Sequence, residues 1–337
     1  MNIKGIAKLA GVSKATVSRV LNDSPLVTED TRKKILEIIK RVDYLPNYLA
    51  RSLKIKETKT IGVIVPDIGN PFYFEVLRGI EKVLDKKDFN IMLCNSDYND
   101  KKELRYIYLL SSKKVDGIIV APCSEESKGI ENLLTWNIPF VTFDIPQTKL
   151  NTNSILVDHS QCSYIATKYL IESGHKNIVI TDVFRHTKTK SKFILGYLKA
   201  LGEHNIPVKQ EFIQEASPDI VGGYNIIKKL ITEKISFTGV ITICDLLAVG
   251  VYKAVNKFNL KIPDDISVIG NDDIPLAKYL NPPLTTIHQP KYLLGLKSAK
   301  LLLSQIQNKN HNDIKVIKLD ARLIKRCSVK RRIKNAS

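Results

Sequence analysis

Residues 3–22 read IKGIAKLAGVSKATVSRVLN, and this stretch decides the fold of the N-terminal part of the chain. Ile6, Leu9 and Ala10 have the three-and-four spacing of one helical face, which predicts a short helix buried on that side. Gly11 stands where this helix should end, because a residue without a side chain takes the left-handed turn at low cost. Ser13 can then cap a second helix with its hydroxyl. The stretch therefore predicts two short helices joined by a tight turn.

The second predicted helix, residues 14–21, has one apolar side and one polar side. Val17, Val20 and Leu21 form the apolar side, which should be buried. The outward-facing candidates for DNA contact are Lys14, Ala15, Thr16, Ser18 and Arg19. Small side chains let a helix approach base edges closely, a guanidinium can read a guanine, and a methyl group can touch thymine. The polar side therefore predicts a helix that enters the major groove.

A third helix should follow, with Thr28 at its cap and Ile35, Ile38, Ile39 and Val42 on its buried face. Three helices of this size share one small core, which is typical of a helix-turn-helix headpiece. The alternative is an ordinary three-helix bundle whose polar side is only solvated. The short motif, the glycine turn and the basic face together favour DNA binding.

The net charge of +18 is concentrated at the two ends of the 337-residue chain. Residues 1–60 carry thirteen basic and six acidic side chains, whereas residues 318–337 carry eight basic side chains against Asp320 alone. A basic head on a nearly balanced body indicates a DNA-binding module joined to another domain. The basic tail resembles a solvated chain end, and we assign it no specific role.

Composition excludes several classes of protein. No apolar run is long enough to cross a bilayer, and the N-terminus lacks the apolar stretch of a secretion signal. The five cysteines are scattered, odd in number and without zinc spacing, and the six histidines show no metal pattern. We therefore expect a cytoplasmic protein without a metal, a cofactor or a membrane partner.

The connector, residues 44–53, reads YLPNYLARSL. Pro46 is tolerated in the first turn of a helix, and Leu49 and Leu53 then lie one turn apart. Such a short helix is not stable alone in water and needs a partner, either its own copy in a dimer or a nucleic-acid surface. Residues 54–60 are charged and lack a core pattern, which predicts a linker.

Residues 6–13 and 15–22 resemble the headpiece of the lactose/galactose-repressor family of bacterial transcription regulators, and residues 44–53 resemble its hinge helix. The resemblance implies a hinge that folds when a dimer occupies its operator. It also implies that Leu53 wedges into the central base step from the minor groove, which bends the duplex. It adds these DNA-contact candidates: Asn22, Tyr44, Asn47, Ala50 and Leu53.

Beyond residue 60, apolar strand-like runs alternate with helical patterns such as residues 74–84 and 165–172, which predicts parallel α/β architecture. The predicted strands are residues 61–66, 90–94, 117–121, 140–144, 177–181, 239–244 and 266–270. The pattern is too long for one sheet and indicates two similar halves.

The family resemblance implies the two-lobe fold of periplasmic sugar-binding proteins, with a ligand cleft between the lobes. The expected fold is thus a small all-α helix-turn-helix headpiece followed by a two-lobe α/β periplasmic-binding-protein-like core. The predicted domains are a headpiece at 1–45, a hinge and linker at 46–59, and an effector-binding and dimerisation core at 60–330. We expect the first lobe at about 60–157 and 289–312, and the second at about 158–288 and 313–328.

Ligands of open α/β sheets bind beyond the carboxyl ends of the strands, so an effector site is expected there. The candidates are Phe72, Tyr73, Asp144, Phe193, Cys244, Asp272 and Gln289. The two aromatic rings at 72 and 73 can stack on a ligand ring, and the two aspartates can accept hydrogen bonds. Asp272 and Gln289 resemble the family's cleft residues, although Gln289 fits a structural contact between the lobes equally well. The run from Asp67 to Asn70 also fits plain turn and helix-cap chemistry.

Two departures from the family pattern bear on the effector. Cys244 replaces the asparagine usual before Asp245, and Phe193 stands where many members have an arginine three residues before Gly196. The loss of an amide and a guanidinium weakens bidentate recognition of sugar hydroxyls or of an anion. A sugar or related metabolite, a less polar ligand, a phosphocarrier protein and no effector at all remain open.

Three functions compete at this point. A repressor that binds a palindromic operator in double-stranded DNA as a homodimer accounts for the headpiece and the hinge. A solute-binding protein would have an export signal and no headpiece. An α/β enzyme would need a glycine-rich phosphate loop, a nucleophile elbow or a catalytic triad, and none of these motifs is present in the sequence.

Overall fold

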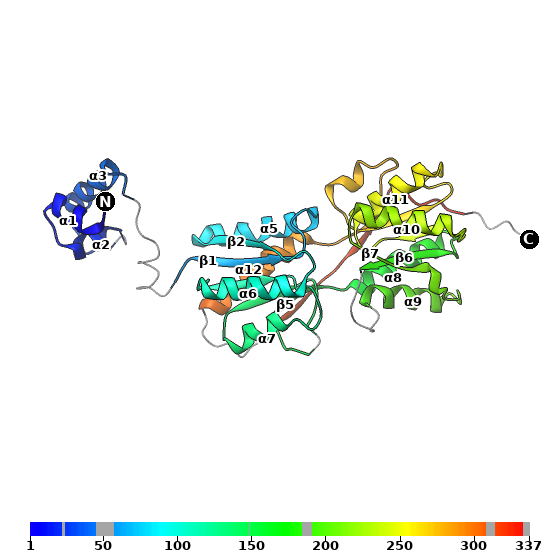
Figure 1. The fold of residues 1–337 in the computed structure, drawn as a ribbon, viewed down its shortest axis with the longest axis horizontal. Coiled ribbons are helices and arrows are strands. Elements are labelled where there is room, and N and C mark those ends of the chain that lie inside the picture. Colours follow the sequence, from blue (N-terminus) through cyan, green and yellow to red (C-terminus); the bar gives the residue numbers. More distant parts are fainter. Residues whose placement is uncertain (22–23, 45–56, 148, 184–190, 308–313, 333–337) are drawn as a thin grey trace, which may run out of the picture. The chain divides into compact units, whose positions relative to one another are not determined.

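The computed structural model describes residues 1–21, 24–44, 57–147, 149–183, 191–307 and 314–332 (Figure 1). The chain divides into two compact units, residues 1–58 and 59–337. Within the described ranges, no helix combines the length and the apolar character needed to span a bilayer.

The first unit is the predicted headpiece. Its helices are α1 (Ile3–Ala10), α2 (Lys14–Leu21) and α3 (Glu29–Arg41). Gly11 ends α1 in the left-handed conformation, with φ of 68°. The Ser13 hydroxyl accepts a 3.0 Å hydrogen bond from the Thr16 N–H and so caps α2. Ile6, Val17 and Ile35 are fully buried, one from each helix, which confirms a single small core.

The buried faces differ in detail from the prediction. Leu9 is 47% exposed, and Ala7 is buried in its place. Ile3, Ile6, Ala7 and Ala10 form one continuous helical face, and Leu9 lies beside that face. Three further predicted core residues are only partly buried: Leu21, Ile39 and Val42.

Thr28 occupies the cap position of α3, but its hydroxyl donates to the hydroxyl of Thr31 and does not cap the helix backbone.

The first lobe of the second unit contains a six-stranded parallel sheet in the order β11-β5-β4-β3-β1-β2. Its elements are β1 (Thr60–Val65), α5 (Pro71–Leu84), η1 (Asp85–Lys87), β2 (Asn90–Asn95), α6 (Asp100–Ser112), β3 (Gly117–Val120), α7 (Lys128–Thr135), β4 (Phe140–Phe143), β5 (Ser154–Val157), α12 (Lys291–Gln307) and β11 (Val316–Leu319). Alternate β1 residues enter separate cores, Val63 with α5 and α12, and Ile64 with α6 and α7.

The second lobe repeats this plan with the order β12-β10-β9-β8-β6-β7, in which only β12 is antiparallel to its neighbour. Its elements are α8 (His159–Glu172), β6 (Ile178–Val183), α9 (Lys192–Glu203), η2 (Gln210–Phe212), β7 (Ile213–Ala216), α10 (Ile220–Thr232), β8 (Gly239–Ile241), α11 (Asp245–Lys257), β9 (Ser267–Asp272), η3 (Pro275–Lys278), β10 (Thr285–His288) and β12 (Arg322–Ile324). The predicted two-lobe α/β architecture is therefore confirmed.

One boundary inside the core needs correction. Residues 313–328 were expected in the second lobe, but β11 pairs with β5 of the first sheet, with Leu319 opposite Val157. Only β12, which pairs with β10, belongs to the second sheet. The chain therefore passes between the sheets three times, after β5, after β10 and after β11.

Helices α5 and α12 pack against each other at two glycines. A Cβ atom at Gly79 would lie 2.1 Å from the Tyr292 carbonyl oxygen, and one at Gly295 would lie 1.9 Å from the Val76 carbonyl oxygen. Any side chain at either position would push the two backbones apart. The close contact fixes the first helix of the first lobe to the helix that returns from the second.

Gly295→Ala should lower the free energy of unfolding by about 1–3 kcal/mol, because the new methyl group overlaps a backbone carbonyl. Urea unfolding followed by circular dichroism measures this change. Gly202→Ala is the matched control, because nothing lies within 4 Å of its added Cβ. Alanine there should raise stability by about 0.5–1 kcal/mol. Equal effects of the two substitutions would contradict the close packing.

Candidate functional site

The outer side of α2 carries the predicted DNA-reading residues. Lys14, Ala15 and Arg19 are exposed, and Thr16 and Ser18 are half-buried. The Thr16 hydroxyl lies 2.9 Å from that of Ser13, so it takes part in the cap of the helix. The geometry thus presents a methyl group, an ammonium and a guanidinium on one side of a rigid short helix, as base readout requires.

The structure describes one of the other five DNA-contact candidates. Tyr44 is half-buried against the headpiece core, and its N–H donates to the Ile39 carbonyl at 3.1 Å. Asn22, Asn47, Ala50 and Leu53 lie outside the described residues. Contacts of all five with DNA remain predictions.

The effector candidates of the first lobe follow β1. Asn70 caps α5 by accepting a hydrogen bond from the Phe72 N–H at 2.9 Å, and Asp67 accepts one from the Gly69 N–H at 2.8 Å. Asp67 therefore stabilises a turn and Asn70 caps a helix, as the turn and helix-cap interpretation of this run predicted. They also fix the start of α5, which carries Phe72 and Tyr73.

Phe72 and Tyr73 are buried, with ring centroids 5.0 Å apart and planes at 85°. A hydrogen bond joins the Tyr73 side chain to Tyr98, which follows β2. The pKa of Tyr73 is raised well above its usual value, mainly by burial, and then by Tyr98, Asp144 and Asp272. Tyr73 therefore lies within electrostatic range of acids from both lobes.

Asp144 follows β4, and its Oδ1 atom accepts a hydrogen bond from the Nε2 atom of His159 at 2.8 Å. His159 begins α8, so this pair joins the end of a first-lobe strand to the first helix of the second lobe. The Asp144 side chain is 14% exposed.

Asp272 and Gln289 are brought together by the parallel register of β9 and β10, in which Asp272 lies opposite His288. The Gln289 side-chain N–H donates to Asp272 Oδ1 at 2.9 Å. Gln289 is only 2% exposed, yet its Oε1 atom has no hydrogen-bond partner among the described residues. A buried acceptor without a donor is costly, so this oxygen is suited to a donor on a ligand.

Burial raises the pKa of Asp272 well above its usual value, and the nearby Asp245 raises it further. The Cys244 pKa is likewise raised, first by burial and then by Asp272, so the thiol is neutral. Asp272 therefore lies within electrostatic range of both Tyr73 and Cys244. That these three residues contact an effector remains a prediction.

Phe193 lies in the first turn of α9, is 2% exposed and belongs to the apolar core. A contact between this ring and an effector remains a prediction.

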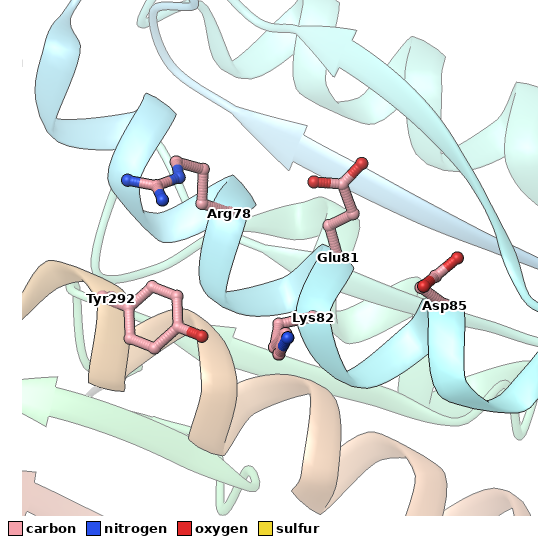
Figure 2. Close-up of a pocket in the computed structure, with 5 residues that line it drawn as sticks. All are labelled: Arg78, Glu81, Lys82, Asp85 and Tyr292. Carbon is pink, nitrogen blue, oxygen red and sulfur yellow. The ribbon is translucent and has the colours of Figure 1, made fainter.

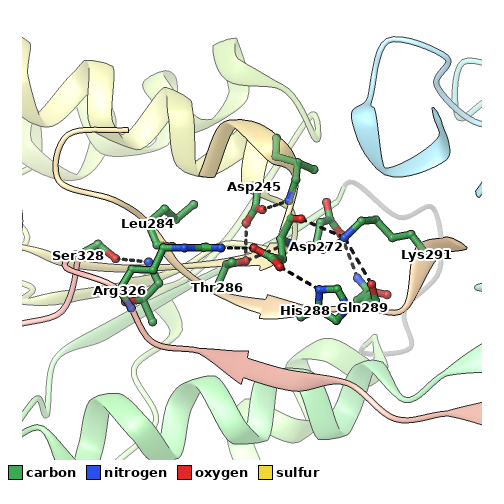
Figure 3. A network of polar contacts seen from close by, with 12 residues as sticks. Asp245, Asp272, Leu284, Thr286, His288, Gln289, Lys291, Arg326 and Ser328 are labelled. Carbon is green, nitrogen blue, oxygen red and sulfur yellow. Dashed lines mark hydrogen bonds and ion pairs between the residues drawn. The ribbon is translucent and has the colours of Figure 1, made fainter. Parts of the chain in front are cut away.

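Asp272 and Gln289 belong to a wider network of polar contacts (Figure 3). Asp245 accepts hydrogen bonds from the Thr286 hydroxyl at 2.6 Å and from the Ile274 N–H at 2.8 Å. Burial raises the Asp245 pKa to about 6, although both hydrogen bonds lower it. Lys291 enters the same network from α12 and is 6% exposed.

Sequence reasoning missed Tyr98, His159 and Lys291. One signal was available for Lys291, because a lysine in the first turn of a helix opposes the helix dipole and needs a compensating partner. Tyr98 and His159 carry no comparable pattern, since their roles arise only when the strand ends meet.

A second feature is a surface depression between α5 and α12, lined by Arg78, Glu81, Lys82, Asp85 and Tyr292 (Figure 2). It combines two basic and two acidic side chains. In the ranges that the structure describes, no group of three or more His, Cys, Asp or Glu side chains could hold a metal ion.

Each of the two units matches a known protein family. Residues 2–47 match the family model of bacterial regulatory proteins of the lacI family. Residues 58–327 match that of periplasmic binding proteins and the sugar binding domain of the LacI family.

Among curated relatives, the ribose operon repressor of Haemophilus influenzae is 38% identical over 92% of this chain and 93% of its own length. The transcriptional repressor PurR of Histophilus somni is 36% identical over 97% of this chain and 98% of its own length.

Among solved structures, the lac repressor dimer bound to operator and the anti-inducer ONPF has a TM-score of 0.86, with 25% identity over 98% of this chain and 99% of that one. A LacI family regulator from Enterococcus faecium with bound ribose has a TM-score of 0.72, with 33% identity over 81% of this chain and all of that one. This chain is therefore a DNA-binding transcription regulator and belongs to the lacI family of bacterial regulatory proteins.

Proposed function

We propose that this regulator represses transcription as a homodimer on a palindromic operator, and that D-ribose or a closely related neutral sugar controls it. The observation that carries the proposal is the buried Gln289 oxygen, which has no donor among the described residues and lies beside the Asp272 carboxyl. Asp272 in turn lies within electrostatic range of Tyr73. A ligand rich in hydroxyl groups supplies the donors that these acceptors need.

The DNA half of the proposal depends on α2. Its exposed Lys14, Ala15 and Arg19 can reach base edges, while Val17 and Val20 hold the helix against the headpiece core. One headpiece of this size reads half a site, so two-fold symmetry in the protein would match a palindrome in the DNA.

The sugar half of the proposal depends on the kind of polar groups at the strand ends. Asp144, Asp272 and Gln289 offer oxygen acceptors, and Phe72 and Tyr73 offer apolar ring faces. Hydroxyl groups match the oxygens, and the C–H face of a sugar ring matches the aromatic side chains. This set contains acceptors and aromatic rings but no cationic donor for a phosphate group, so a neutral sugar fits it better than a sugar phosphate. The names of the ribose operon repressor and of the ribose-bound neighbour agree with this assignment.

A protein co-regulator such as a phosphocarrier protein is the second candidate. The depression between α5 and α12 offers Arg78 and Lys82 to a phosphorylated surface. Glu81 and Asp85 offset these two charges, which weakens the attraction for an anion. A change in operator affinity on adding D-ribose alone would favour the sugar over the protein.

Arg19→Ala should weaken binding to the selected operator by about 1–3 kcal/mol and relax the preference at one base position, because direct readout is lost. Operators are first selected from randomised DNA, and affinities are then measured by gel shift at fixed salt. Lys33→Ala is the charge-matched control, because Lys33 is exposed on α3, outside the reading helix. Equal losses on operator and random DNA would mean that Arg19 contacts only phosphate.

Asp272→Asn should weaken D-ribose binding about threefold to tenfold, because an amide N–H₂ replaces one carboxyl oxygen that can accept a hydrogen bond, and one such bond contributes about 0.5–1.5 kcal/mol. Operator binding without sugar should be unchanged. Isothermal titration calorimetry with D-ribose measures the first effect and gel shift the second. Asp88→Asn is the control, because Asp88 is exposed and, like Asp272, has a positive φ. The φ angle is 55° at Asp88 and 133° at Asp272. Unaltered sugar affinity in Asp272→Asn would remove Asp272 from the site.

A further inference from the structure

The backbone at the end of β9 is strained. Asp272 has φ of 133° and Asp273 has φ of 58°, so two successive residues with side chains adopt conformations that favour glycine. Such a corner persists only where surrounding contacts hold it in place. We call residues 272 and 273 the β9 corner.

Contacts within the second lobe hold one side of the corner. The Asp273 carboxylate is bound by His288 Nδ1 at 2.9 Å and by Arg326 Nη2 at 2.5 Å. The next amide, Ile274 N–H, donates to Asp245 at 2.8 Å. These bonds fix side chains and the following amide, but they leave the two corner carbonyls unbound.

Lys291 binds those carbonyls from the other lobe. Its ammonium donates to the carbonyl oxygen of Asp272, to that of Asp273 at 3.0 Å and to that of Gln289 at 3.4 Å (Figure 3). Its backbone begins α12 of the first lobe.

A buried ammonium in the first turn of a helix is unfavourable for two reasons. It loses its hydration, and it lies at the positive end of the helix dipole. Burial accordingly lowers the Lys291 pKa, while Asp272, Asp273, Asp245 and Glu75 oppose that shift. The three carbonyl contacts and these carboxyl groups offset the unfavourable placement.

We propose that Lys291 is a positioning residue that clamps the β9 corner to the first lobe and thereby couples the effector site to α12. The inference rests on the proposed function in one respect, namely that the effector contacts Asp272 and Gln289.

The clamp joins the two ligand-contacting residues through their backbones. One ammonium binds the carbonyls of both Asp272 and Gln289, whose side chains also bind each other at 2.9 Å. A ligand that shifts either side chain therefore shifts the start of α12. Because α12 contacts α5 through Gly79 and Gly295, the shift reaches the helix that carries Phe72 and Tyr73.

The test compares Lys291→Met with Lys300→Met, which changes an exposed lysine of the same helix. Methionine keeps an unbranched apolar stem of similar size and lacks the ammonium. Hydrogen–deuterium exchange of the full chain without ligand is measured for peptides covering 271–275 and, as an internal reference, 178–183 in β6. Lys291→Met should speed exchange in 271–275 about tenfold or more while β6 stays protected. Lys300→Met should change neither peptide.

The second measurement is the response of operator affinity to D-ribose, by gel shift. Lys291→Met should lose most of the change caused by sugar, measured as the ratio of operator affinities with and without D-ribose in the same variant. Lys291→Arg, which keeps charge and donors, should restore part of both the protection and the response.

Several results would overturn the clamp. Unchanged exchange at 271–275 in Lys291→Met would contradict it. Faster exchange in both 271–275 and β6 would also contradict it, because Lys291 would then stabilise the whole fold. A full sugar response in a variant with a loosened corner would overturn the coupling. If the wild type does not respond to D-ribose, the proposed effector fails, and the exchange data still decide whether Lys291 holds the corner.

Discussion

The parallel pairing of β9 with β10 is the constraint on which the core depends. Its register sets Asp272 opposite His288, so the residues that follow each strand, Asp273 and Gln289, leave the sheet at the same edge. The contacts of Asp245, Asp272, Gln289 and Lys291 in Figure 3 follow from that edge, because it brings β9, β10, α11 and α12 into hydrogen-bonding range. A slip of one residue would turn Asp272 to the opposite face and disperse the group.

The headpiece and the core position their functional side chains in different ways. Its three helices share one small core, and Gly11 supplies the conformation that lets α1 and α2 meet within a short turn. The reading helix is held by two buried valines, so its exposed side can be occupied by residues chosen for DNA and not for packing. The core instead builds its site where strands end, with each side chain supplied by a different element.

Sequence patterns predicted most of this fold but only part of the site. Strands buried on both faces, such as β1 and β6, are continuous apolar runs and were identified, whereas β5, β7, β10, β11 and β12 lack such a run and were missed. Edge strand β11 was also given to the wrong lobe, because its partner β5 is set by the path of the chain and not by its own residues. Tyr98, His159 and Lys291 were missed for the same reason, since contacts between distant segments define them.

The interleaved path of the chain has a consequence for synthesis on the ribosome. The first lobe lacks its packing helix and one edge strand until residues 291–307 and 316–319 have been made, after all but the last strand of the second lobe. Domains generally fold in the order in which they emerge. Here the N-proximal lobe must wait with one sheet face covered by α5 but not by α12, so the nascent polypeptide exposes apolar surface to chaperones until translation is nearly complete.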